Sequence, residues 1–185
     1  MASAVMTSYA STSDTQPRIR RMPEKAAGTF LMGVPVQFDP VAAGIKEWDG
    51  TTVTQGIAGI SKEPASNLTA TGVKQFQVLT NSPVPYQPLA QAIVRGAPYN
   101  DGLIGFEEAV QSTIFFGQVG PAQTVAATDL GLQYGMSKDS DGHWFVDKTK
   151  TGGANAVVQI VKLDPIDTVR GVQFTFLPAT QQFLS

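Results

Sequence analysis

Glycine and proline interrupt this chain at short intervals, with 18 glycines and 12 prolines among 185 residues. Both residues destabilise the interior of a helix, so the chain is divided into pieces that suit short strands better than long helices. Valine and threonine occur 18 times each, whereas leucine occurs only 10 times. Because β-branched side chains pack well on a pleated sheet, the sequence predicts an all-β fold with minor helix content and many turns.

The second half of the chain gives the clearest strand signals. Residues 132–137 and 143–147 read as a hairpin, in which Asp141-Gly142 supplies the positive φ that a tight turn needs. Alternating apolar and polar residues predict strands over 155–164 and 169–178. Further strands are expected at 28–38, 55–61, 73–79 and 112–120, and one or two helical turns at 106–111.

Composition shifts divide the chain into four parts. Residues 1–22 lack periodicity and are predicted to form a flexible N-terminal arm. An N-terminal β lobe at 23–80 and a C-terminal β lobe at 104–185 are expected to be joined by a proline-rich connection at 81–103. We find no internal repeat period. Segments 34–40 and 158–165 share a strand that ends in Asp-Pro, which is a weak match.

Charge is scarce, since only 15% of residues are charged against about 25% in ordinary soluble domains. Such a surface suits a protein that packs against other copies or another protein. Residues 1–22 carry three arginines and one aspartate, whereas the rest carries ten basic and fourteen acidic residues. Arg18, Arg20 and Arg21 are therefore predicted to meet acidic groups of a partner. The acidic body does not favour nucleic-acid binding, and no apolar run reaches the ~18 residues of a membrane span.

No residue pattern in this sequence predicts catalysis, a cofactor or a metal site. The chain has no cysteine and one histidine, His143, which excludes thiol chemistry and a multi-histidine metal site. No Gly-x-Ser-x-Gly elbow accompanies that histidine. Asp139, Asp141 and Asp147 lack the spacing of a calcium-binding EF-hand loop. The adjacent Glu107 and Glu108 point apart on either a helix or a strand, so they do not form a general acid/base pair.

Trp48 and Trp144 are the two tryptophans, and each lies beside an Asp-Gly turn. Tryptophans near loop tips can bind sugars or anchor a protein partner. The alternative is that both rings cover a small hydrophobic core. The sequence alone leaves both interpretations open.

Two blocks of the chain combine turn and strand motifs. The first block is AAGTFLMGVPVQFDP with EWDGTTVTQGIAGISKE, which has a Gly-x-x-Phe entry, a Trp-Asp-Gly turn and a Gly-Ile-Ala-Gly-Ile strand. The second is DLGLQYGMSKDSDGHWFVDKT with AVVQIVKLDP and VQFTFLP. Together these blocks cover about two-thirds of the chain, and they resemble capsid decoration (cement) proteins of tailed bacteriophages.

The resemblance implies small β-barrel or β-tulip lobes that bind the outside of an assembled capsid. It also implies a structural virion protein without enzymatic activity, made in the cytoplasm of a bacterial host. Its expected partners are the major capsid protein and other copies of itself, often as trimers. The alternative function is a glycan- or receptor-binding module of a head fibre or adhesin, with Trp48 or Trp144 as its platform.

Overall fold

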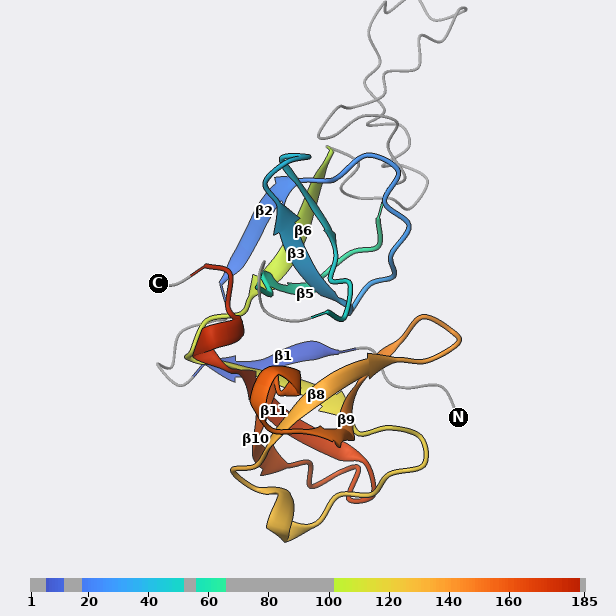
Figure 1. Ribbon diagram of the computed structural model, residues 1–185, viewed down its shortest axis with the longest axis vertical. Coiled ribbons are helices and arrows are strands. Elements are labelled where there is room, and N and C mark those ends of the chain that lie inside the picture. Colours follow the sequence, from blue (N-terminus) through green and yellow to red (C-terminus); the bar gives the residue numbers. More distant parts are fainter. Residues whose placement is uncertain (1–5, 12–17, 52–55, 66–101, 184–185) are drawn as a thin grey trace, which may run out of the picture.

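The computed structural model describes residues 6–11, 18–51, 56–65 and 102–183 (Figure 1). These residues form strands and three short 3₁₀ helices, which confirms the predicted all-β fold. The N-terminal lobe consists of β2 (Ile19–Pro23), β3 (Pro35–Asp39), β4 (Gly44–Glu47), β5 (Gly59–Ser61) and β6 (Leu103–Glu108). The C-terminal lobe consists of β1 (Thr7–Ser11), β7 (Thr113–Gln118), β8 (Gln133–Lys138), β9 (Trp144–Thr151), β10 (Val158–Leu163) and β11 (Gly171–Phe176). The 3₁₀ helices are η1 (Ala127–Asp129), η2 (Gly153–Asn155) and η3 (Pro178–Thr180).

Each lobe is built on one antiparallel sheet. The N-terminal sheet has the strand order β2-β6-β5-β3-β4, and the C-terminal sheet has the order β1-β7-β11-β10-β8-β9. When β1 is left out, the two orders are the same. If the five strands of each lobe are numbered in the order in which they occur in the sequence, each sheet has the order first, fifth, fourth, second, third. The chain therefore repeats one topology, in which β2 corresponds to β7 and β6 corresponds to β11.

Individual backbone contacts repeat with the topology. In each lobe an isolated parallel bridge joins the first strand's end to the third strand, at Glu24–Ile45 and at Val119–Val146. In each lobe a backbone hydrogen bond also joins the residue after the first strand to the residue before the fifth strand. Glu24 N donates to Gly102 O at 3.0 Å, and Val119 N donates to Arg170 O at 2.9 Å. The weak match between residues 34–40 and 158–165 is not this repeat, because β3 corresponds to β8.

The expectation of barrels is wrong for these sheets, which are not closed. A closed barrel needs a continuous ladder between the strands at the two ends of the sheet order. Here a single bridge joins the end of β2 to β4 in the N-terminal lobe, and a single bridge joins the end of β7 to β9 in the C-terminal lobe. In the C-terminal lobe β1 pairs with β7 over Thr113–Phe116, on the side that a closing strand would need.

The lobes also differ from the predicted boundaries. β1 and β2 lie within the predicted arm of residues 1–22 or at its end, and each pairs with a sheet strand. β6 begins at Leu103, inside the predicted connection, yet it pairs with β2 and β5 of the N-terminal lobe. In the sequence, residues 66–101 therefore lie between β5 and β6, which are neighbouring strands of the N-terminal sheet, and not between the two lobes. The predicted strand at 73–79 lies outside the described residues.

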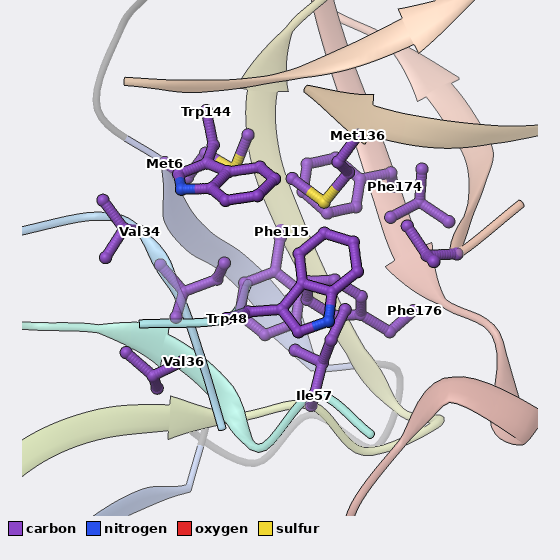
Figure 2. Packing of buried hydrophobic residues seen from close by; sticks show 14 of the residues in the cluster. Met6, Val34, Val36, Trp48, Ile57, Phe115, Met136, Trp144, Phe174 and Phe176 are labelled. Carbon is purple, nitrogen blue, oxygen red and sulfur yellow. The ribbon is translucent and has the colours of Figure 1, made fainter. Parts of the chain in front are cut away.

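One hydrophobic core extends through both lobes. Figure 2 shows Val34, Val36 and Trp48 of the N-terminal lobe beside Trp144 and the phenylalanines of the C-terminal lobe. Phe115, Phe174 and Phe176 form a triangle of rings with centroids 5.2–5.9 Å apart. Because the inward residues of both sheets share this core, the lobes form one packed body. No helix in the described part of the chain is long and apolar enough to span a membrane.

Candidate functional site

Two of the three predicted arginines bind carboxylates of their own chain. The Arg20 guanidinium contacts the Glu108 carboxylate and lies 4.6 Å from the centre of the Phe183 ring. Arg21 Nη1 donates to Glu63 Oε1 at 2.7 Å. Arg18 is exposed and forms no ion pair with any carboxylate in the described residues. The prediction that these arginines meet acidic groups of a partner thus stays open for Arg18, while Arg20 and Arg21 have partners within the fold.

The acidic residues of β6 explain why Arg20 binds its own chain. Glu107 and Glu108 are both buried, and a buried carboxylate is costly unless a cation or hydrogen-bond donors compensate it. Lys62 Nζ supplies the cation for Glu107 at 2.7 Å, as Arg20 does for Glu108. These ion pairs lie across the β2, β6 and β5 strands and hold the N-terminal sheet together.

Trp48 and Trp144 are buried, with only 4% and 5% of their surfaces exposed. Their ring centroids are 5.0 Å apart, at an interplanar angle of 37°. Trp48 follows β4 of one lobe and Trp144 begins β9 of the other, so the pair joins the two lobes (Figure 2). The core-covering interpretation of the tryptophans holds, and neither ring forms an exposed sugar platform.

Glu47 completes this junction. Its carboxylate accepts a hydrogen bond from Trp144 Nε1 at 2.8 Å and forms an ion pair with Lys138 Nζ at 2.7 Å. The turn after Trp48 allows the close packing, because Gly50 has a φ of +75° and a Cβ there would lie 3.1 Å from the Trp144 ring. Sequence reasoning missed Glu47, although an acid directly before Trp48 is the signal that could have indicated it.

The C-terminal segment joins the lobes a second time. Thr180 O accepts from Ile57 N at 2.6 Å, and Gln182 N donates to Ile57 O at 3.0 Å. The Gln182 side chain then accepts from Phe38 N at 2.6 Å and donates to Phe38 O at 2.7 Å. The segment after η3 thus binds the β3 and β5 region of the N-terminal lobe.

Asp147 is satisfied by neighbours within the C-terminal lobe. Burial acts to raise its pKa, but hydrogen bonds from Ser137, Thr149 and Gln123 outweigh burial and lower the pKa to about 2. A carboxylate held ionised by several donors is poorly suited to proton transfer near neutral pH. Its arrangement is that of a structural hydrogen-bond centre.

Asp129 and Tyr134 form a second such centre. Tyr134 donates from its hydroxyl to Asp129 Oδ1 at 2.7 Å, and Lys148 Nζ lies 2.7 Å from Oδ2. Burial, followed by the bond to Asp129, raises the pKa of Tyr134 to about 12. Burial also opposes ionisation of Asp129, but Lys148 and Tyr134 outweigh it and lower the Asp129 pKa. This network fixes the connection before β8.

The turn between β8 and β9 has no ligand geometry for calcium. Asp139 Oδ1 accepts from the backbone N–H groups of Asp141 at 3.0 Å and His143 at 2.8 Å, so its carboxylate closes the turn. Within the described residues no group of three or more Asp, Glu, His or Cys side chains could hold a metal ion.

Five exposed aliphatic side chains belong to segments at the end of the C-terminal lobe farthest from the N-terminal lobe, where Figure 1 shows the connection before β8 and the β10–β11 turn. Residues 130–132 lie beside β10, because Gly131 N donates to Ile160 O and Ile160 N donates to Leu132 O. The β10–β11 turn follows directly, and its Ile166 is 92% exposed. We call this group the distal apolar patch: Leu130, Leu132, Val161, Ile166 and Val169.

Nothing in the sequence analysis singled out the distal apolar patch. Its members are spread over 40 positions, and the pairing of residues 130–132 with β10 brings two parts of this stretch side by side. Comparisons with protein-family models, with curated proteins and with solved structures found no match for this chain.

Proposed function

We propose that this chain is a structural virion protein that binds the outer surface of an assembled phage capsid and stabilises it. The proposal starts from the resemblance of the two sequence blocks to capsid decoration proteins. The observation that supports it best is the distal apolar patch, because several large apolar side chains left exposed at one end of a protein suit an interaction site.

The chemistry of the interior agrees with a structural role. The buried carboxylates of Asp147, Asp129 and Glu107 are each bonded to donors or cations within the fold. The two lobes are joined through Trp48 and Trp144 and again through the C-terminal segment. A rigid body with an apolar end can bind a shell without a large loss of conformational entropy.

Binding to the assembled state alone stabilises that state, since any ligand of one state shifts the equilibrium towards it. In this proposal the distal apolar patch faces the shell, and the major capsid protein is the partner. The low overall charge of the chain lowers the cost of desolvating the contact.

Capsid reconstitution tests this function. Shells stripped of the chain should regain it on addition of the wild-type protein, and their melting temperature should rise. Ile166→Lys, in the distal apolar patch, should bind with lower occupancy. Val41→Lys is the matched control, because Val41 is 94% exposed on the turn between β3 and β4 of the other lobe. Absence of the wild-type protein from the shells, or equal binding by Ile166→Lys, would contradict the proposal.

A further inference from the structure

Two Asp-Gly pairs lie in turns of the described structure, and their aspartate side chains differ in how firmly they are held. The pairs are Asp49-Gly50 after β4 and Asp141-Gly142 between β8 and β9. In such a pair the aspartate carboxyl group reacts readily with the main chain, because glycine has no Cβ that shields its nitrogen. The aspartate of a third pair, Asp101-Gly102, lies outside the described residues.

The Asp49 carboxylate is held in place by Thr51. Its Oδ1 accepts a hydrogen bond from Thr51 N at 3.0 Å and another from Thr51 Oγ1 at 2.7 Å. Burial acts to raise the pKa of Asp49, but these hydrogen bonds outweigh burial and lower the pKa. The carboxylate therefore stays ionised, and an ionised carboxylate is a poor target for a nucleophile. Gly50 is held as well, since a Cβ at this position would lie 3.1 Å from the Trp144 ring.

The Asp141 carboxylate has no comparable contact. The residue is exposed, and in the described part of the chain no group donates a hydrogen bond to its side chain or forms an ion pair with it. Gly142 N donates a long hydrogen bond, of 3.2 Å, to Asp139 O. Figure 1 shows the turn between β8 and β9 as a loop that projects from the side of the molecule. The Asp141 side chain can thus rotate towards Gly142 N without breaking a contact of its own.

We infer that Asp141 is a site of spontaneous isomerisation to isoaspartate in the folded protein. In the first step Gly142 N forms a bond to Asp141 Cγ, and one carboxyl oxygen leaves as water with the amide proton and a proton from solvent. In the second step water adds to the main-chain carbonyl carbon of Asp141. The bond from that carbon to Gly142 N breaks, the nitrogen takes back a proton, and the freed carbon becomes the new carboxylate. The product has the mass of the original chain, but its main chain runs through Cβ and Cγ of residue 141.

Isomerisation adds one carbon to the main chain of a turn that three hydrogen bonds close. Asp139 Oδ1 accepts from Asp141 N at 3.0 Å and from His143 N at 2.8 Å, and Asp139 N donates to His143 O at 2.9 Å. A longer main chain within this turn cannot keep all three bonds at these lengths. Trp144 follows directly and packs against Trp48 of the other lobe, so the modified chain should be less stable at the junction of the lobes.

This inference does not rest on the proposed function. The turn between β8 and β9 carries no member of the distal apolar patch, and the reaction needs only water. It can therefore be tested with the isolated full-length protein, and its failure would leave the proposed capsid binding untouched.

The test is to age the folded protein at physiological temperature and neutral pH and to count isoaspartate at each pair. Trypsin separates the pairs, because it cuts after lysine and releases them in peptides 47–62 and 139–148. Protein isoaspartyl methyltransferase labels the modified residues, and fragmentation in a mass spectrometer locates them. Peptide 139–148 should accumulate several-fold more isoaspartate than peptide 47–62, and the label should lie on residue 141.

Two controls assign this difference to the fold. In guanidinium chloride both peptides should accumulate isoaspartate at similar rates, because neither carboxylate is then held. Asp141→Glu keeps the charge but would have to close a larger and less favourable ring, so its peptide should stay unmodified. Aged wild-type protein should melt at a lower temperature than Asp141→Glu protein aged in the same way.

Three results would count against the inference. Absence of isoaspartate at residue 141 of the folded wild-type protein would overturn it, and so would equal amounts in the two peptides of the folded protein. Equal melting temperatures for the aged wild type, once modified, and the aged Asp141→Glu variant would overturn the expected effect on the junction of the lobes.

Discussion

At the scale of single residues, the buried polar groups of this protein act as structural centres. Asp147 accepts hydrogen bonds from Ser137, Gln123 and Thr149, which come from three segments of the C-terminal lobe. Each such bond contributes only modestly to the free energy of unfolding, but removal of one partner leaves the other partner buried without a hydrogen bond, which lowers that free energy by more. The stability of the fold should therefore depend on the ionised form of this carboxylate.

The pKa of Asp147 predicts a specific acid sensitivity. Its folded-state pKa is about 2, below the ordinary value of 3.8, so its contribution to stability is present above pH 4 and is lost as the pH falls towards 2. The lost contribution is about 2 kcal/mol. Asp147→Asn should thus be less stable than the wild type at pH 7, and urea unfolding should show the difference shrinking between pH 4 and pH 2. A difference that stays constant down to pH 2 would contradict this role.

At the scale of elements, turn chemistry and strand pairing explain which predictions succeed. The hairpin over 132–147 was predictable because Asp141-Gly142 and the alternating flanks are local signals, and the structure confirms it as β8 and β9. The strands predicted at 155–164 and 169–178 are likewise confirmed as β10 and β11. The helical turns predicted at 106–111 are wrong, since residues up to Glu108 belong to β6.

The failures have a common physical reason, which is contact between distant segments. Glu107 and Glu108 lie in the segment for which helical turns were expected, but they belong to a strand, and the cations that bind them, Lys62 and Arg20, come from distant parts of the sequence. The repeated topology could not be predicted from the sequence, because corresponding strands share the pairing of their backbones while their side chains differ. Arg20 of β2 corresponds to the buried Phe115 of β7, and no sequence comparison would align those two residues.

The β5–β6 ladder gives a test at this scale. A Cβ on Gly59 would overlap the carbonyl oxygen of Glu107, a backbone atom that cannot move aside easily. Gly59→Ala should therefore lower the free energy of unfolding by about 3 kcal/mol. Gly152→Ala is the control, because Gly152 has a φ of +65° but no atom within 4 Å of an added Cβ, so only about 1 kcal/mol should be lost. Equal urea midpoints for the two variants would refute the close approach.

At the scale of the whole molecule, the two lobes behave as one body because their core is shared. Trp48 and Trp144 join the lobes on one side, and the C-terminal segment after η3 joins them through Ile57 and Phe38. β1 and β2 belong to opposite lobes, although only seven residues separate them along the chain. Removal of residues 1–22 would therefore take a strand from each sheet.

The tryptophan junction predicts the strength of this coupling. Trp48→Ala removes a large buried ring and should lower the free energy of unfolding by about 3–5 kcal/mol. Val41→Ala, on a residue that is 94% exposed, should change it by less than about 0.5 kcal/mol. Urea unfolding followed by circular dichroism measures both. A loss below 1 kcal/mol for Trp48→Ala would show that the ring is not an essential part of the core.

The proposed function concerns the surface that this rigid body presents to a shell. The most direct test of this proposal is a cryo-electron microscopy reconstruction of purified virions of a tailed phage whose genome carries the gene for this chain. Our account predicts repeated density for both lobes on the outside of the shell, with the β10–β11 turn and Ile166 against the capsid protein. Virions that lack the chain, or density in which the distal apolar patch faces solvent, would contradict it.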